Sequence, residues 1–350
     1  MTGSKRIVSV VTGTNSNLGL NIAYRFLESV PPDVRVTLIV TSRTLPRVNE
    51  VISKIKNYHD NHLKRAGTLD FDYLLVDFTN MVSVLTAIYE LKRNYKEINY
   101  VFINAAQGVY AGIDWVGATF EVLRNPLKSV SNPTYKIQKV GVKSADGLGL
   151  VFQANVFGPY YFLKKIQDLL SAGKARIIWI SSLLSNSNYL SLNDIQLLNS
   201  NVSYEGSKRL VDLLHLASYN DLNNANITQY LVHPGIFISL SFLKFLNVFS
   251  YYGMIALFYF GRLLGSPWHN IGGYKGANAP IFAATKADPK FDKQDVKYGS
   301  ACTIKGSEFI KISPVDNSDA KQIYSYFKEL ELEWDEKLKD QIADTRKEYP

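Results

Sequence analysis

The sequence predicts an α/β fold in which a doubly wound parallel sheet carries helices on both faces. Short apolar runs typical of buried strands alternate with segments of helical periodicity along most of the 350 residues. Small or polar residues directly follow these runs, at the carboxyl ends of parallel strands where open α/β sheets bind ligands. Because no internal repeat is visible, we expect one elaborated domain rather than an array.

The first strand, turn and helix are typical of a nucleotide-binding unit. Residues 7–11 are apolar except for Ser9, a small-residue turn follows, and the helical pattern then ends at Pro31. A pyrophosphate would lie at the N-terminus of this helix. The residues expected around it are Gly13, Asn15, Asn17, Leu18 and Gly19. Asn17 replaces a glycine of the usual pattern, and we expect the turn to survive because asparagine tolerates positive φ. An ordinary strand–turn–helix is the alternative.

The second strand, residues 36–40, ends in Thr41, Ser42 and Arg43. Folds that bind NAD place an acidic residue here to hold the ribose hydroxyls, and this chain has none. Arg43 offers a planar cation for a 2′-phosphate, and Arg47 lies one turn later. NADPH is therefore expected rather than NADH. The alternative is that both arginines are solvated residues at the start of a helix.

Three further strand ends carry candidate cofactor residues. Asp77 follows the third strand at the expected adenine edge, Asn104 follows the fourth, and Pro234 and Gly235 follow the sixth. Between the fourth strand and the next helix, residues 108–147 are irregular. We interpret them as an insertion over one edge of the site, and their sequence indicates no chemistry.

The candidate catalytic residues follow the fifth strand. That strand ends at Ser182, and Tyr204 and Lys208 come later with the i,i+4 spacing that places both on one helical face. A phenol titrates near pH ~10, and a neighbouring ammonium is expected to lower that pKa. Asn155 lies inside a helical segment, where asparagine is unfavourable. Two explanations for an asparagine at this position are a local hydrogen bond to the backbone and a catalytic role.

These residues together predict a carbonyl reductase. Tyr204 would donate a proton to the substrate oxygen as hydride arrives, and Ser182 would hold the same oxygen. Lys208 would lower the tyrosine pKa and reach the nicotinamide ribose. Asn155 would position a water that links the lysine to solvent. The cofactor would carry the hydride chemistry.

An uncharged stretch at residues 245–261 separates the last candidate cofactor residues from the C-terminal part. It is flanked by Lys244 and Arg262 and as a helix would span about 25 Å, slightly less than a bilayer core of about 30 Å. Its two interpretations are a buried helical hairpin and a segment that dips into one leaflet. We expect residues 240–265 to form an apolar flap at the substrate and membrane side.

The chain ends in a charged segment with an apolar helical stripe. The stripe residues are Ile323, Phe327, Leu330, Trp334, Leu338 and Ile342. We expect this helix to pack on its own domain rather than to form a partner surface.

Composition excludes several classes of protein. Lysine and arginine exceed acidic residues by 39 − 31 = 8, but they are dispersed, so nucleic-acid binding is not expected. The single cysteine, Cys302, excludes an intramolecular disulfide and a thiolate metal site, and we expect no metal. The N-terminal apolar run of about five residues is too short for a signal-peptide core.

In this order, the motifs resemble the short-chain dehydrogenase/reductase superfamily with its Rossmann-type fold. The resemblance covers residues 7–303 and rests on the glycine turn, Asn104-Ala105-Ala106, Asn155, Ser182, Tyr204, Lys208 and Pro234-Gly235. It implies that Ile236 and Ser239 also lie near the cofactor, with Ser239 where a threonine is usual. Asn17, the changed Asn104 motif and the longer spacing from Ser182 to Tyr204 depart from the family pattern.

Longer runs such as TGTNSNLGLNI and YEGSKRLVDLLHLA look like those of the fungal 3-keto-steroid reductases. That resemblance implies NADPH-dependent reduction of a C4-demethylated 3-keto sterol to the 3β-alcohol in ergosterol synthesis. It implies residence at the endoplasmic reticulum membrane and lipid droplets, beside the other C4-demethylation enzymes and oxidosqualene cyclase. We expect the chain to consist of an NADP-binding catalytic domain, 1–305, and a C-terminal amphipathic helical extension, 306–350.

Two other functions remain open from the residues. One is a soluble reductase of small ketones, with the apolar stretch buried in an oligomer. The other is a scaffold that keeps the fold and holds other sterol enzymes together, against which the intact Ser182, Tyr204 and Lys208 argue.

Overall fold

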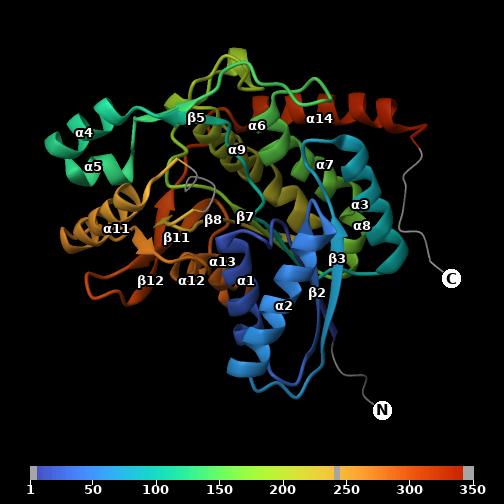
Figure 1. Cartoon of the computed structure of the whole chain (residues 1–350). Coiled ribbons are helices and arrows are strands. Elements are labelled where there is room, and N and C mark those ends of the chain that lie inside the picture. Colours follow the sequence, from blue (N-terminus) through green and yellow to red (C-terminus); the bar gives the residue numbers. More distant parts are fainter. Residues whose placement is uncertain (1–5, 240–244, 342–350) are drawn as a thin grey trace.

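The computed structural model describes residues 6–239 and 245–341 and contains the predicted doubly wound sheet (Figure 1). Eight strands lie in the order β12-β11-β8-β7-β4-β1-β2-β3, in which β12 is the edge strand Glu308–Pro314. Seven of them are parallel: β1 (Arg6–Val11), β2 (Arg35–Ser42), β3 (Leu69–Leu75), β4 (Tyr100–Ile103), β7 (Arg176–Ile180), β8 (Thr228–His233) and β11 (Val296–Cys302). The order reverses at β1 and β4, so the candidate site residues meet at one edge of the sheet.

Helices cover both faces of the sheet and bury a separate core on each. The first core lies under α1 (Asn17–Ser29), α2 (Leu45–His62), α12 (Gly273–Gly276) and α13 (Asn278–Ile281). The second lies under α3 (Met81–Asn94), α6 (Leu150–Phe152), α7 (Gly158–Lys165), α8 (Gln167–Ala172), α9 (Ser203–Asn224) and α14 (Ala320–Leu338). This division fixes α1 and α9, which carry the two halves of the site, on opposite faces.

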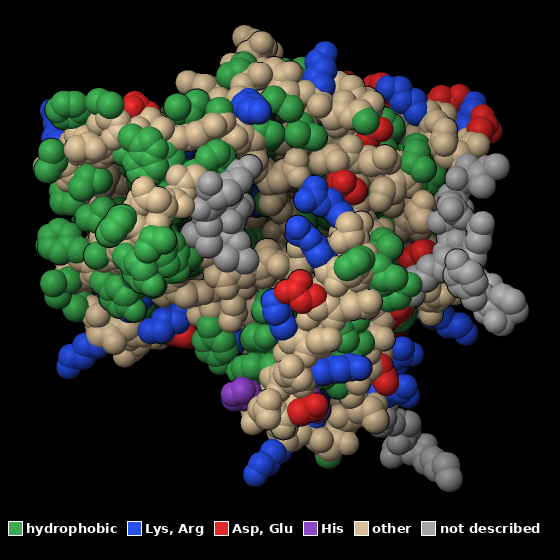
Figure 2. Space-filling model, in the orientation of Figure 1, with side chains coloured by type: hydrophobic (Ala, Val, Ile, Leu, Met, Phe, Trp, Pro, Cys, Tyr) green, Lys and Arg blue, Asp and Glu red, His purple; other side chains and the backbone are tan. Residues whose placement is uncertain are grey.

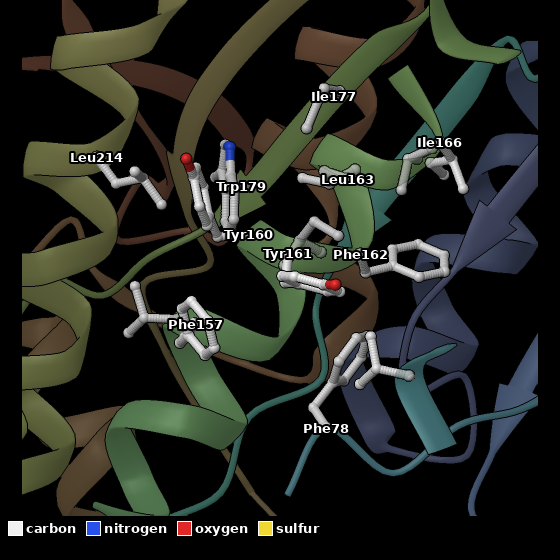
Figure 3. Close-up of a cluster of buried hydrophobic side chains, with 14 of the residues drawn as sticks. Phe78, Phe157, Tyr160, Tyr161, Phe162, Leu163, Ile166, Ile177, Trp179 and Leu214 are labelled. Carbon is white, nitrogen blue, oxygen red and sulfur yellow. The ribbon is translucent and has the colours of Figure 1, made fainter. Parts of the chain in front are cut away.

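Several aromatic side chains cluster in the second core (Figure 3). Phe78 meets Phe162 edge to face, with ring centroids 5.9 Å apart. Phe327 of α14 packs against Phe152 and Tyr160, with ring centroids 5.5 and 5.3 Å away. The C-terminal helix therefore packs on its own domain, as predicted, through the apolar stripe from Ile323 to Leu338. Ile342 lies outside the described residues.

Three elements differ from the sequence-based expectation. Residues 306–350 are not all helical, because β12 (Glu308–Pro314) pairs antiparallel with β11 and adds an edge strand to the sheet. The helical pattern of residues 274–285 predicts one further helix, but the segment is divided into α12, α13 and a π-helix (Phe282–Lys286). Pro280 has no N–H to donate to the Gly276 carbonyl, which accepts from the Ser300 hydroxyl at 2.7 Å instead.

The third difference is a second π-helix (Gln153–Phe157), which contains Asn155. Short π-helical turns inside α-helices are frequent at functional sites. The loop between β7 and α9 forms two 3₁₀ turns, Ser187–Tyr189 and Leu192–Asp194.

The insertion at 108–147 has structure of its own. A hairpin of β5 (Tyr110–Ile113) and β6 (Lys136–Gln138) carries α4 (Trp115–Arg124) and α5 (Pro126–Ser131). These helices lie beside α11 (Val248–Leu263), which follows β9 (Ile236–Phe237) and precedes β10 (His269–Ile271) (Figure 1). We call α4, α5 and α11 together the lobe.

The apolar stretch is one helix within the described residues, not the buried hairpin that the sequence also allowed. One face of α11 contacts Val130 and Ile271 through Phe258, and its other face is exposed. Across 6–239 and 245–341, helices that combine the length and the apolar character needed to cross a bilayer are absent.

Candidate functional site

The turn between β1 and α1 requires glycine at two positions. Gly13 has a φ of +63°, and a Cβ on Gly19 would lie 2.3 Å from the Gly13 carbonyl oxygen. Ser16 caps α1 by accepting from the Gly19 N–H, and Asn104 donates to the Ser16 hydroxyl at 3.2 Å. The turn thus brings the end of β4 against the N-terminus of α1, where anions bind.

Asn17 keeps this turn intact for a reason other than the one expected. It is the first residue of α1 and has helical geometry, so a positive φ is not used. Its side-chain amide instead donates to the Ile238 carbonyl at 2.8 Å. The asparagine therefore joins the helix start to the segment after Gly235, which a glycine could not do.

A pocket of about 670 Å³ brings together eight of the predicted cofactor residues. Those that line it are Gly13, Asn15, Thr41, Ser42, Arg43, Arg47, Asp77 and Asn104. Arg43 and Arg47 are exposed, and no described acidic side chain forms an ion pair with Arg43. The Asp77 carboxylate accepts from the Thr79 N–H and hydroxyl at 2.9 and 2.8 Å and so shapes the loop after β3.

The remaining predicted cofactor residues lie outside the lining of this pocket. Leu18 is buried in the core under α1. Gly235 has a φ of +68°, and a Cβ there would meet the Asn270 amide and the Trp268 carbonyl at 2.6 Å. Pro234 is held through its carbonyl by Asn270, Ile236 pairs with β10, and Ser239 is exposed.

Tyr204 and Lys208 lie in the first two turns of α9, as their spacing predicts. The Lys208 ammonium donates to the Ile180 carbonyl at 2.7 Å and lies 5.7 Å from the centroid of the Tyr204 ring. Burial lowers the pKa of Lys208 to about 8, partly opposed by the carboxylate of Asp212. The lysine is therefore a buried cation whose charge depends on pH near neutrality.

The pKa of Tyr204 is raised, which is opposite to the expected effect of Lys208. Burial is the main cause, and the carboxylate of the adjacent Glu205 adds to it. The ammonium binds the Ile180 carbonyl rather than the phenol. The phenol therefore keeps its proton at neutral pH, which is the form that can act as an acid.

Asn155 makes non-local hydrogen bonds rather than the local backbone bond considered above. Its side-chain oxygen accepts from the Gln107 N–H at 2.8 Å, and its amide donates to the Gln107 carbonyl and to the Ser207 hydroxyl, both at 2.9 Å. The π-helical turn thereby connects the segment after β4 to α9. Gln107 lines the cofactor pocket, so this network links both halves of the site.

Ser182 follows β7, and its hydroxyl accepts from the Leu184 N–H at 3.0 Å. Beside it lies a buried ion pair between Asp212 and Lys297. Asp212 accepts from Ser185 at 2.7 Å and also from Ser181, and Lys297 donates to the Ser182 carbonyl at 3.3 Å. Sequence reasoning missed this pair, although Asp212 repeats the i+4 spacing after Lys208 and could have been found by it.

Sequence reasoning also missed Gln138, which belongs to the insertion. Its side-chain oxygen accepts from the Tyr204 N–H at 3.0 Å and from the Ser203 hydroxyl at 3.1 Å. Its amide donates to the Glu205 carboxylate at 2.6 Å. Val202, the residue before α9, provides no side-chain cap, so Gln138 of β6, which is distant in sequence, caps the catalytic helix instead. No sequence signal indicates this contact.

Named relatives match this chain over nearly its whole length. A 3-keto-steroid reductase of Kluyveromyces lactis is 61% identical over 346 residues, which are 99% of this chain and 99% of the relative. The chain belongs to the 3-keto-steroid reductase family. The 3-keto-steroid reductase ERG27 of Saccharomyces cerevisiae is 61% identical over 97% of this chain and 99% of its own length. A family member from Yarrowia lipolytica is 38% identical over 95% and 97% of the two chains.

Solved structures share the fold at low identity. L-sorbose reductase of Gluconobacter frateurii, solved with NADPH and L-sorbose, has a TM-score of 0.55 at 13% identity and covers 81% of this chain and 91% of its own. The NADPH-bound carbonyl reductase from chicken fatty liver has a TM-score of 0.52 at 15% identity, with 87% and 99% covered. The predicted Rossmann-type α/β fold is thus confirmed. No protein-family model matches the chain.

Proposed function

We propose that this chain is an NADPH-dependent reductase that converts the C3 ketone of a C4-demethylated sterol intermediate to the 3β-hydroxyl in ergosterol synthesis. The observation that carries the proposal is the placement of Tyr204 and Lys208 on α9, held to the cofactor pocket through Asn155 and Gln107. The name of the relatives at 57–61% identity supplies the substrate class.

The residues of the pocket fit NADPH. Gly13 and Gly19 leave no room for a Cβ where the pyrophosphate would approach the N-terminus of α1. Arg43, at the end of β2, has no described acidic partner and would bind a 2′-phosphate, with Arg47 one turn further along. When bound, NADPH supplies the hydride that adds to the substrate carbon.

The proton comes from the protein. As the carbonyl carbon accepts hydride, the Tyr204 phenol donates its proton to the carbonyl oxygen and becomes a phenolate. The Ser182 hydroxyl donates a hydrogen bond to the same oxygen and stabilises its developing charge. The ketone thus gains one hydride and one proton and leaves as an alcohol.

Lys208 acts on the phenolate that remains. Its ammonium, 5.7 Å from the ring centroid of Tyr204, stabilises the negative charge that forms during the step and would hydrogen-bond the nicotinamide ribose. Asn155 would position a water through which Lys208 and Tyr204 regain a proton from solvent. The raised pKa of Tyr204 favours this resupply, because it keeps the phenol protonated between turnovers.

We extend the proposal to location and partners. The protein would work at the cytosolic face of the endoplasmic reticulum membrane and on lipid droplets, where a water-insoluble sterol ketone would dissolve. It would associate there with the other C4-demethylation enzymes and with oxidosqualene cyclase. The exposed apolar face of α11 supports a membrane location.

The experiment is NADPH oxidation by the purified protein in detergent, with a 3-keto sterol or a small ketone as substrate and mass detection of the alcohol. We expect turnover of the sterol to the 3β-alcohol with NADPH and much slower turnover with NADH. Reduction of only small ketones would favour a general carbonyl reductase. No reduction of any ketone, with the fold intact, would favour a scaffold.

A further inference from the structure

The exposed face of α11 is an apolar stripe. Phe249, Tyr252, Tyr259 and Leu263 are exposed at positions that repeat with the period of a helix, and Phe249 has 88% of its surface exposed. The opposite face already contacts α5 and β10 through Phe258. The helix therefore has enough apolar surface for its own packing and presents a second apolar face outward.

The insertion repeats this pattern on α4. Val116, Phe120 and Leu123 stand at i, i+4 and i+7, with 69%, 70% and 77% of their surfaces exposed, and Trp115 is beside them. Ala118 is buried on the other face. Two helices more than 120 residues apart in the sequence thus share one unusual feature.

The two stripes belong to one surface. Val130 of α5 packs against Phe258 of α11, and α4 is joined to α5 directly. Figure 2 shows hydrophobic side chains gathered over the side of the molecule where Figure 1 places α4, α5 and α11. Contiguous exposed apolar surface of this kind marks a docking site rather than scattered surface residues.

The exposed charged side chains of the lobe are cationic. Arg124 and Lys128 are exposed on α4 and α5, whereas Glu121 is half-buried and accepts from Thr134 at 3.0 Å. On α11 the single charged residue, Arg262, is buried and donates to the His269 carbonyl at 2.7 Å. The exposed part of these three helices is therefore apolar with a cationic border and carries aromatic side chains.

We propose that α4 and α11 together form a membrane-docking face, in which the insertion supplies half of the surface that inserts into an anionic bilayer. This deepens the proposed function, since a sterol ketone dissolved in the bilayer would reach Tyr204 from this side. Apolar and aromatic side chains enter the headgroup and acyl boundary, and Arg124 and Lys128 bind anionic headgroups.

The same insertion reaches the active site from its other end. β6 holds the start of α9 through Gln138. Tyr110 of β5 lies close to Tyr204: burial raises the pKa of Tyr110, and the neighbouring Tyr204 raises it further. The docking face and the catalytic tyrosine are thus connected by one short hairpin. Because of this connection, we favour a substrate-bearing lipid surface, rather than an unrelated protein, as the partner that binds the docking face.

The test is flotation of the purified protein with vesicles of phosphatidylcholine, with or without phosphatidylinositol. We expect Phe120→Glu with Leu123→Glu on α4 to lower the vesicle-bound fraction of the protein by about tenfold or more. The same loss is expected for Phe249→Glu with Tyr252→Glu on α11. The matched control is Phe291→Glu with Leu332→Glu, two exposed apolar residues outside the lobe, which should bind like the unchanged protein.

A second measurement does not require the introduction of a charged residue into the lobe. Brominated phosphatidylcholine should quench the fluorescence of Trp115, and Trp115→Phe should remove that quenching. Wild-type flotation of the α4 variant, or absence of Trp115 quenching, overturns the proposal. The proposal is also overturned if the unchanged protein is a dimer, the α4 variant is a monomer, and neither protein binds vesicles. Both lobe variants should still reduce the sterol in detergent. If the unchanged protein does not reduce the sterol in detergent, the proposed function is refuted rather than the docking face.

Discussion

Gln138→Met is the sharpest test of how the insertion serves the site. The substitution keeps the length and volume of the side chain but removes all three hydrogen bonds to the start of α9, those with Ser203, Tyr204 and Glu205. Because Val202 provides no cap of its own, the first turn of α9 then has no side-chain cap. Tyr204 lies in that turn.

The magnitude follows from the bonds that are lost. Loss of a helix N-cap costs about 1 kcal/mol, and a hydrogen bond to a charged group contributes about 1.5–3 kcal/mol. Glu205 is buried, so its carboxylate regains little hydration. We expect the free energy of unfolding to fall by about 2–3 kcal/mol, and kcat to fall on the order of tenfold as the first turn frays.

Urea unfolding and steady-state kinetics measure both effects, with Gln322→Met on the exposed face of α14 as the matched control. The Kd for NADPH should stay unchanged, since Gln138 does not line the cofactor pocket. Equal stability and equal kcat in the two variants would refute the role assigned to Gln138.

Two further predictions concern the cofactor and pH. Arg43→Ala should weaken NADPH binding by about 10–100-fold, the loss of a charge-assisted contact, and leave NADH binding nearly unchanged. Arg35→Ala, at the other end of β2, is its control in the same fluorescence titration, and equal losses for both cofactors would contradict the assignment. Since the pKa of Lys208 is about 8, kcat/KM should fall as the pH rises through that value and the ammonium loses its charge. Asp212→Asn removes a charge that raises this pKa and should move the alkaline limb to lower pH, whereas Lys297→Met removes a charge that lowers it and should move the limb to higher pH. Shifts in the same direction, or none, would show that the pair does not act on Lys208.

The strand ends and the catalytic spacing could be predicted because they depend on local patterns. Buried parallel strands appear as apolar runs, and residues that follow them share one edge of the sheet. This placed Arg43, Asp77 and Asn104 in one pocket, and i,i+4 spacing placed Tyr204 and Lys208 on one helix.

What could not be predicted depends on contacts between distant segments. Gln138 caps α9 across 66 positions, and Asn17 reaches Ile238 across 221, so neither partner is visible in a local window. The direction of the Tyr204 pKa shift depends on burial and on which group Lys208 binds. The edge strand β12 lies in a segment interpreted as part of a helical extension.

The central claim, that Tyr204 supplies the proton for ketone reduction, is tested most directly by Tyr204→Phe. The measurement is NADPH-dependent conversion of a 3-keto sterol by the purified variant in detergent, with NADPH binding measured on the same sample. We expect NADPH to bind as before while turnover falls by about 10²–10⁴-fold, the range for loss of a general acid. Turnover within a few-fold of the unchanged protein would contradict the account.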